Sequence, residues 1–358
     1  LRDLTLSSLG EIDYSFVSPR LLREELASEL RQDPLMRDRF TRLTPILSLP
    51  GSVRHPDLGR RASDISIHGV DERFLEFFPE FLRLGPQLAN DSESFPPVVI
   101  NAGLRDELGA EVGDQILVSF GRRPAVNPEF ALGSRKSLDL QGTVRATLVE
   151  VVPDTSLGRF SLRSHQAGPH NIFIGLDVLQ EAAEQEGMAN IFLMSGESRE
   201  AGELEAHFNE GFQKLLTLSD LGLKWRSSGS EMILESRELI ISPSLEQNIR
   251  TAAAQVGLDP QTILTYLANS IGSDQTIPYS TVTALDLEGE PFRENLRLVS
   301  GEPVPELGGD EILLDEWAAT ELGAREGDLL TLTYSVVDWK EDLTTLESAF
   351  RLKGIVEM

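Results

Sequence analysis

Two stretches of the chain repeat one pattern of hydrophobic and polar positions. Val98–Phe120 and Ile312–Tyr334 each begin with a short apolar run, continue as a helix-like segment, pass a Gly-Asp pair and end in alternating apolar and polar residues. Six of the eight residues in Glu107–Asp114 recur at the corresponding positions of Glu321–Asp328. Apolar runs and alternation are typical of strands, so the pattern predicts a strand–helix–strand unit that occurs twice.

The ends of the two short helices are also predicted by residue type. Asn101 and Asp315 stand where a side chain can accept a hydrogen bond from the free N–H groups of a first helical turn. Gly109 and Gly323 stand where each helix ends, so we expect both glycines to have positive φ. These features describe structure and carry no chemistry of their own.

The two halves of the chain predict the same order of elements. In the first half, Ser18–Pro19 follows an alternating stretch and reads as the start of a helix through Leu35. In the second half, Ser242–Pro243 reads as the start of a helix through Val256. Two further strands follow each helix: Leu43–Leu49 and Ala62–Val70 in the first half, Ile263–Ala268 and Pro278–Leu285 in the second.

Only the first half carries an additional strand–helix–strand–helix run. Its segments are Ile172–Ile174, Leu176–Glu186, Asn190–Met194 and Glu203–Leu216. No counterpart follows the second copy within the sequence. The two copies lie too far apart in the chain for the short period of a solenoid, so we interpret the pattern as duplication of a whole domain. Chance remains the alternative for the eight-residue match alone.

Composition narrows the function classes. The 358 residues include 58 acidic and 32 basic side chains, a formal net charge of −26, which repels nucleic-acid phosphates and anionic lipid headgroups. The chain has no cysteine, which excludes disulfides, thiolate zinc sites and thiol catalysis. No stretch approaches the run of consecutive apolar residues that indicates a membrane span.

Candidate chemistry is sparse. None of the five histidines pairs with another at metal-site spacing in a helix, and we expect them on the surface or in loops: His55, His68, His165, His170 and His207. Nucleophile elbows, Walker loops and dinucleotide-binding glycine motifs are absent from the sequence. We therefore predict no catalytic, cofactor-binding or metal-binding residue and no cofactor. We expect Trp317 to be a core anchor and not a ligand platform. We expect the cluster Phe74, Phe77 and Phe78 to pack over a sheet, and the alternative is an exposed patch for a partner.

The order of motifs resembles a known family. "VVINAGLRDELGAEVGDQILV", "GTVRATLVEVV" and "NIFIGLDVLQ" in the first half, with "DEILLDEWAATELGAREGDLLTLTY" and "FRLKGIVEM" in the second, resemble the extracytoplasmic domain of FtsX/MacB-type ABC transporter permeases. The second half is similar to a longer, uncharacterised branch of that family. The resemblance covers nearly the whole chain.

The resemblance implies an α+β fold in which porter-like α/β parts alternate with β-rich Sabre-like parts, internally duplicated. It places the porter-like parts at residues 1–70 with 153–218 and at 219–300, and the Sabre-like parts at 71–152 and 301–358. It implies a periplasmic, non-enzymatic domain of a bacterial inner-membrane protein that binds a partner or cargo and relays ATP-driven movement. The implied partners are a cytoplasmic ATPase subunit, reached through membrane helices, a periplasmic protein or lipoprotein or lipid cargo, and a second permease copy.

Two other functions stay open at this point. One is a periplasmic hydrolase-like enzyme with a site built from loops such as Arg163–His170, and the other is a freestanding adaptor. Under the permease interpretation, we expect Leu4–Leu9 and Phe350–Val356 to be ordered and on one side of the molecule. Membrane segments would then lie before Leu1 and beyond the C-terminal end.

Overall fold

The computed structural model divides the chain into two compact units, which we call unit 1 and unit 2. Among the described residues, unit 1 comprises those up to Leu223 and unit 2 those from Lys224 onward. The structure describes residues 8–37, 39–89, 95–121, 141–162, 168–196, 201–229, 231–236, 241–287, 292, 296–337 and 343–357. Only the backbone is described at residues 35, 141, 201–207, 337 and 343. The predicted α+β class is confirmed in both units.

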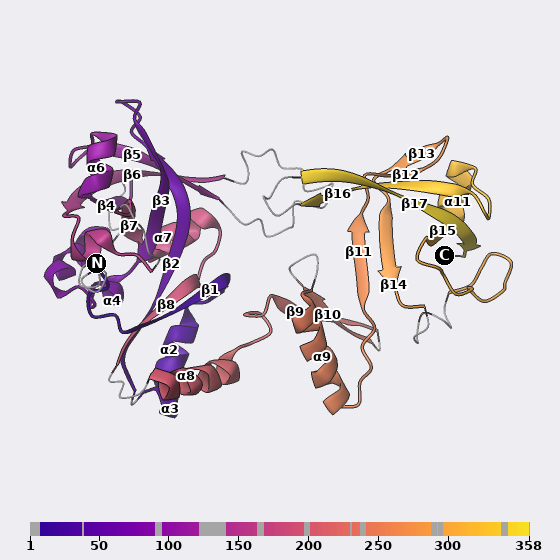
Figure 1. The fold of residues 1–358 in the computed structure, drawn as a ribbon, viewed down its shortest axis with the longest axis horizontal. Coiled ribbons are helices and arrows are strands. Elements are labelled where there is room, and N and C mark those ends of the chain that lie inside the picture. The colour runs from indigo at the N-terminus through magenta and orange to yellow at the C-terminus, as the bar shows by residue number, and fades with distance from the viewer. Residues whose placement is uncertain are drawn as a thin grey trace. The chain divides into compact units, whose positions relative to one another are not determined.

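Unit 1 contains an eight-stranded sheet in the order β1-β8-β2-β3-β7-β4-β6-β5 (Figure 1). The long strand β2 also pairs with β5, so β2, β3, β7, β4, β6 and β5 form a closed ring. The strands are β1 (Tyr14–Arg23), β2 (Phe40–Arg54), β3 (Arg61–Val70), β4 (Pro97–Asn101), β5 (Gln115–Gly121), β6 (Gln141–Val152), β7 (Asn171–Gly175) and β8 (Met188–Gly196).

Short helices cover the sheet of unit 1. They are α2 (Glu25–Gln32), α3 (Pro34–Arg37), α4 (Glu72–Leu75), η1 (Pro79–Leu84), α5 (Gly85–Leu88), α6 (Ala102–Leu108), η4 (Ser156–Arg159), α7 (Leu176–Ala183) and α8 (Ala201–Leu215). The helix α2 buries Leu26, Ala27 and Leu30, because their spacing places all three on one face.

The core of the ring consists of side chains from all six of its strands. Val53, Ile67, Ile100, Val118 and Ile172 belong to one buried cluster with α6 and α7 residues. A second cluster packs Phe74, Phe77 and Phe78 against Val99 and Phe173 on the other face of β4 and β7. All five residues of β4 and all five of β7 are consequently buried. The predicted packing of the phenylalanine cluster is confirmed.

Unit 2 contains a five-stranded sheet, β13-β12-β16-β17-β15, and two-stranded pairs β9–β10 and β11–β14. Its strands are β9 (Leu223–Ser228), β10 (Glu231–Ser236), β11 (Ile263–Leu267), β12 (Ser270–Gly272), β13 (Thr276–Pro278), β14 (Thr281–Leu285), β15 (Glu311–Asp315), β16 (Leu329–Val337) and β17 (Leu343–Val356). Its main helices are α9 (Pro243–Gln255) and α11 (Glu316–Leu322). One core cluster, containing Ile271, Leu314, Leu322, Leu332 and Leu352, joins α11 to this sheet.

The two predicted strand–helix–strand units are confirmed. They are β4-α6-β5 and β15-α11-β16, and Gly109 and Gly323 end the helices at φ 64° and 61°. In unit 1, β4 pairs in parallel with β6, and β5 pairs with β6 antiparallel. In unit 2, β15 pairs in parallel with β17, and β16 pairs with β17 antiparallel. Both parallel ladders shift register at equivalent positions, after Val98 and after Ile312.

Hydrogen bonds at the Gly-Asp turns are also equivalent. Asp114 Oδ2 accepts from the Glu111 N–H at 2.8 Å, and Asp328 Oδ2 accepts from the Arg325 N–H at 2.8 Å. Because each aspartate bonds the backbone three residues earlier, both turns have the same closed geometry.

The predicted helix start at Ser18–Pro19 is wrong. Both residues lie in β1, and the first helix begins at Glu25. Pro19 falls where the pairing of β1 with β8 is interrupted, between Val17 and Leu22, so its missing N–H costs no ladder bond. Ser242–Pro243 does begin α9, as predicted. The Leu4–Leu9 segment lies outside the described residues except at its last two positions, whereas Phe350–Val356 forms the end of β17.

Replacing Gly109 or Gly323 by Ala should lower the free energy of unfolding of its unit by about 1 kcal/mol or more, because a Cβ disfavours the left-handed region. At Gly109 the added Cβ would also lie 2.7 Å from Arg60 Nη1, so that side chain must move. Urea unfolding followed by circular dichroism measures the effect. Gly121→Ala is the matched control, since Gly121 has open space and no positive φ. An equal loss of unfolding free energy in Gly121→Ala would contradict the requirement for a left-handed residue at Gly109 and Gly323.

Candidate functional site

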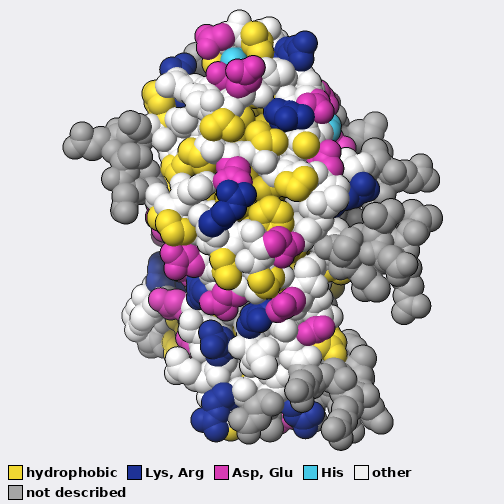
Figure 2. All heavy atoms as spheres, turned by 90° about the vertical axis from the view of Figure 1, so that its left-hand side faces the viewer, with side chains coloured by type: hydrophobic (Ala, Val, Ile, Leu, Met, Phe, Trp, Pro, Cys, Tyr) yellow, Lys and Arg dark blue, Asp and Glu magenta, His cyan; other side chains and the backbone are white. Residues whose placement is uncertain are grey.

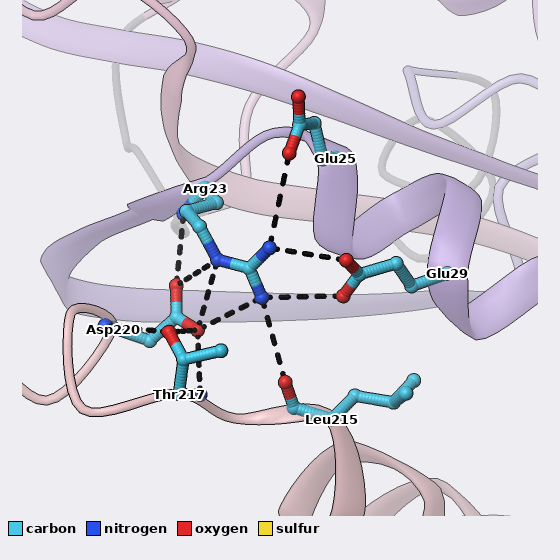
Figure 3. Close-up of polar contacts among 6 residues, drawn as sticks. All are labelled: Arg23, Glu25, Glu29, Leu215, Thr217 and Asp220. Carbon is cyan, nitrogen blue, oxygen red and sulfur yellow. Dashed lines mark hydrogen bonds and ion pairs between the residues drawn. The ribbon is translucent and has the colours of Figure 1, made fainter.

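The most extensive charged network in the described part of unit 1 surrounds Arg23, at the end of β1 (Figure 3). Arg23 Nε lies 3.1 Å from both Asp220 carboxylate oxygens, and Nη2 donates to Asp220 Oδ2 at 3.1 Å. Its guanidinium also donates to Glu29 Oε1 at 3.0 Å and Oε2 at 3.2 Å. The network therefore connects β1 to α2 and to the loop that follows α8, far later in the chain.

Asp220 is the buried member of this network. Its side chain has no solvent exposure, and it accepts further hydrogen bonds from the Thr217 N–H at 2.9 Å and hydroxyl at 2.8 Å. Burial raises the pKa of Asp220, but the bonds from Arg23 and Thr217 outweigh it and leave the pKa below its usual value. Hydrogen bonds to Glu29 and then to Asp220 raise the pKa of Arg23. Both groups are therefore charged at neutral pH.

The network lies next to the segment that leads out of unit 1. Leu223, three residues after Asp220, is the last residue of this unit. Arg20 Nη1 adds a hydrogen bond to the Leu221 carbonyl at 3.2 Å, and Arg23 Nη2 reaches the Leu215 carbonyl at 3.4 Å. We call Arg23, Glu29 and Asp220 the exit clamp, because they hold this segment against β1 and α2.

The described histidines do not form a catalytic constellation, and two of them are buried instead of exposed. His55 Nε2 lies 3.0 Å from Asp114 Oδ2, while His55 Nδ1 accepts from the Leu58 N–H at 3.3 Å, so a neutral ring satisfies both contacts. The Glu111 N–H and then His55 lower the pKa of Asp114. This pair joins the end of β2 to the Gly-Asp turn of unit 1.

His68 corrects the prediction of surface or loop histidines most clearly. It lies in β3, is 5% exposed, and packs between Phe160 and Phe173 with ring centroids 5.1 and 5.4 Å away. Burial lowers the pKa of His68 to about 4, partly opposed by the Asn171 side chain. His68 is therefore a neutral core residue at physiological pH.

The remaining histidines add no further site. His170 Nδ1 lies 3.5 Å from Glu107 Oε2. His165 lies outside the described residues, as does most of the predicted loop Arg163–His170, and the side chain of His207 is not described. Among the described residues, no three His, Asp or Glu side chains lie close enough together to hold a metal ion.

Asn101 also has a role that differs from the predicted one. Its amide donates to Asp154 Oδ1 at 2.7 Å and accepts from the Asn171 backbone N–H at 3.0 Å. Asp154 Oδ1 accepts from the Gly103 N–H at 3.1 Å and so caps α6 in place of Asn101. In unit 2 the prediction is confirmed, because Asp315 Oδ1 accepts from the Ala318 N–H at 2.6 Å. Asn101 therefore anchors β7 to β4.

Two surface depressions in the described part of the chain are shallow. They occupy equivalent places, one beside Ala110 and Val151 in unit 1 and one beside Ala324 and Ile355 in unit 2. Figure 2 shows a face of unit 1 on which hydrophobic side chains are interspersed with both acidic and basic ones, with no continuous area of one charge. Trp317 is 64% exposed, so its predicted burial in the core is wrong.

Comparisons with known proteins give matches only among solved structures. A scan against protein-family models matches no family, and a search of curated proteins finds no match. The chain is similar to the extracellular domain of the noncanonic ABC-type transporter YknZ from Gram-positive bacteria, with 12% identity and a TM-score of 0.32 over 59% of this chain and 94% of that one. It is also similar to the periplasmic region of MacB from Actinobacillus actinomycetemcomitans, with 10% identity and a TM-score of 0.34 over 66% and 91%.

The helices within the described ranges include none long and apolar enough to cross a membrane.

Replacing Arg23 by Met should lower the free energy of unfolding of unit 1 by about 3 kcal/mol, because it leaves the buried Asp220 carboxylate without its counter-charge. Adding Asp220→Asn should restore part of the loss, since the amide keeps an acceptor for Thr217 and removes the charge. Urea unfolding of the full chain measures both. Lys214→Met removes an exposed ion pair with Glu210 and serves as control. A loss in Arg23→Met no larger than in this control would show that the exit clamp does not stabilise unit 1.

Proposed function

We propose that the chain is the extracytoplasmic domain of an ABC-type permease, that it is not an enzyme, and that it binds a partner or cargo while relaying ATP-driven movement. The observation that supports this most is the order of motifs along almost the whole chain. The twin strand–helix–strand units are the most specific of those motifs, and their matched pairings are consistent with a duplicated domain of this kind. The domain would work as a mechanical and binding element.

The exit clamp supports the relay part of the proposal. Movement passes through a domain only if the elements at its connections are held rigidly, since a slack connection absorbs displacement. Arg23 is located where the first strand ends, and Asp220 lies just before the chain leaves unit 1. This arrangement supports transmission of a displacement of β1 to the segment that leads into unit 2.

The proposed partners follow from the same interpretation. A cytoplasmic ATPase subunit would drive the domain through membrane helices, and a periplasmic protein, lipoprotein or lipid would be the cargo. A homodimer of the full-length permease is part of the proposal, as is a periplasmic location at a bacterial inner membrane. We retain the division into porter-like parts (1–70 with 153–218, and 219–300) and Sabre-like parts (71–152 and 301–358) as a proposal. The hydrolase alternative rests on the Arg163–His170 loop, of which the structure describes only residues 168–170.

A flexible insertion tests the relay. Six Gly/Ser residues placed between Leu221 and Gly222 should uncouple the domain, because the added slack separates the exit clamp from unit 2. In the full-length protein assembled with its ATPase in membranes, we expect ATP hydrolysis to continue and transporter-dependent growth or export to be lost. The same six residues inserted after Gly301, in an exposed turn of unit 2, serve as control and should leave both readouts intact.

Two outcomes would contradict the proposal. Full function of the variant with the Leu221 insertion would show that the segment relays no movement. The permease interpretation would also be wrong if the full-length protein were found outside the membrane fraction and without an associated ATPase.

A further inference from the structure

A histidine stands inside the aromatic core of unit 1. The ring of His68, in β3, lies edge-on to Phe160 and stacks on Phe173, with centroid distances of 5.1 and 5.4 Å. Phe74 of α4 contacts the same two phenylalanines at 5.3 and 6.0 Å. We call these four residues the aromatic cluster. A neutral imidazole fits the cluster as a further flat ring, whereas an imidazolium would place a charge in it.

The polar atoms around His68 suit a neutral ring. Asn171 lies close enough to influence the pKa of His68, yet its side-chain oxygen and both ring nitrogens are buried without a hydrogen-bond partner among the described residues. The Asn171 amide nitrogen is already used, because it donates to the carbonyls of Gly158 and Phe160 at 3.3 and 2.9 Å. One N–H of His68 can be directed to the Asn171 oxygen. A second N–H, which appears on protonation, finds no further acceptor in this part of the described chain.

Charged side chains on the elements around His68 are directed to solvent or to other partners. Burial and then Asn171 are the causes that move the pKa of His68, so no charged side chain of the described residues contributes to it. The strands β4 and β7 contain no charged residue, and Ser48 is the residue opposite His68 on β2. The charged residues of the other neighbouring elements are the exposed Asp64, Glu72 and Glu76, the partly exposed Arg159, Asp71, which is bonded to Arg73, and Asp154, which is bonded to Asn101. A proton on His68 would thus remain an uncompensated buried charge.

A short surface segment covers the aromatic cluster. It comprises η4 and the residue after it, and we call Ser156–Phe160 the covering segment. Leu157 and Phe160 are buried in the aromatic core, whereas residues 153–155 before the segment are exposed. The Ser156 hydroxyl donates to Glu80 Oε1 at 2.5 Å. Ser156 has φ 46°, a conformation that is strained for a residue other than glycine, so release of the segment would relieve this strain.

We propose that His68 and the covering segment form an acid-sensitive latch in unit 1: when His68 takes up a proton, the segment separates from β3 and β7 and water reaches the imidazolium. The covering segment gives way and not a strand, because β3 and β7 each pair with a strand on both sides. The latch is assigned from contacts within unit 1 and does not require the permease function.

The direction of the pH effect follows from the two pKa values of the ring. Burial lowers the pKa of His68 from 6.5 to about 4 while the latch is closed. The open form therefore binds the proton more tightly, and acid favours opening. The closed form is fully favoured above pH 6.5, and its advantage falls as the pH drops from 6.5 to about 4. At pH 5 the closing equilibrium should be about 30-fold weaker than at pH 8.

Amide hydrogen exchange of the chain at pH 8 and pH 5, expressed as protection relative to an unprotected amide at the same pH, tests the latch. The N–H groups of Gly158 and Phe160 report on it, because both donate to carbonyls at the covering segment. Their protection should fall about 30-fold at pH 5, while that of β1 and α2 persists. His68→Leu should abolish the fall, since leucine keeps the core apolar and does not titrate.

His170→Gln is the matched control, because this histidine is the residue before β7 but its ring lies near Glu107, outside the aromatic cluster. It should show the same 30-fold fall as the unaltered chain. The proposal would be overturned by unchanged protection of the unaltered chain at pH 5, or by an equal fall in His68→Leu. An equal fall in β1 and α2 would overturn it too, since it would mean that acid unfolds the whole unit.

A second measurement does not depend on any variant. In the unaltered chain with ¹⁵N-labelled histidine, the ring nitrogens of His68 should give the resonances of a neutral imidazole at pH 5.5 while the N–H groups of Gly158 and Phe160 remain protected. A protonated His68 ring at pH 5.5, with these two N–H groups still protected, would show that the closed form accepts the charge and would overturn the latch.

Discussion

The hydrogen bonding of β7 between β3 and β4 is the interaction on which the ring of unit 1 depends. With β7 in place, each of the six ring strands pairs with two others of the ring, and Ile172 and Phe173 extend the cores on the two faces of the sheet. Asn101 and Asn171 connect the start of β7 to the end of β4. In the described part of unit 2 the same order of strands stops at this position, and the strands on either side are correspondingly less buried.

Local features of the chain could be predicted from the sequence because neighbouring residues determine them. The left-handed conformations of Gly109 and Gly323 follow from a helix that ends in glycine before a Gly-Asp turn. Ser18–Pro19 shows the limit of this reasoning. The same pair begins α9 at Ser242–Pro243, but in unit 1 it lies in a strand, because the residues on either side of it pair with β8, which is distant in the chain, and this pairing overrides the local preference.

The exit clamp could not be predicted because its residues have no distinguishing sequence context. Asp220 is one of 58 acidic residues, and nothing in its neighbourhood distinguishes it until the fold places it 3.1 Å from Arg23. His68 was equally hidden, since a histidine in an apolar run is recognised as a core residue only when its aromatic neighbours are known. The exposure of Trp317 was missed because the helix that carries it is short and buries its alanine and leucine side chains instead.

Amide hydrogen exchange in the free chain of residues 1–358 tests the central claim, that β7 covers the edge of β3 in unit 1 whereas the corresponding edge of β14 in unit 2 pairs with no strand among the described residues. Under this account, the N–H of Ser66 is protected because it donates to the carbonyl of His170, just before β7. The N–H groups of Thr281 and Thr283, which face away from β11, should exchange at rates close to those of unprotected amides. The N–H of Val282, which faces β11, should be protected and marks β14 as folded. Slow exchange at Thr281 and Thr283, comparable to that of Ser66, would show that the edge is already covered and would contradict the account.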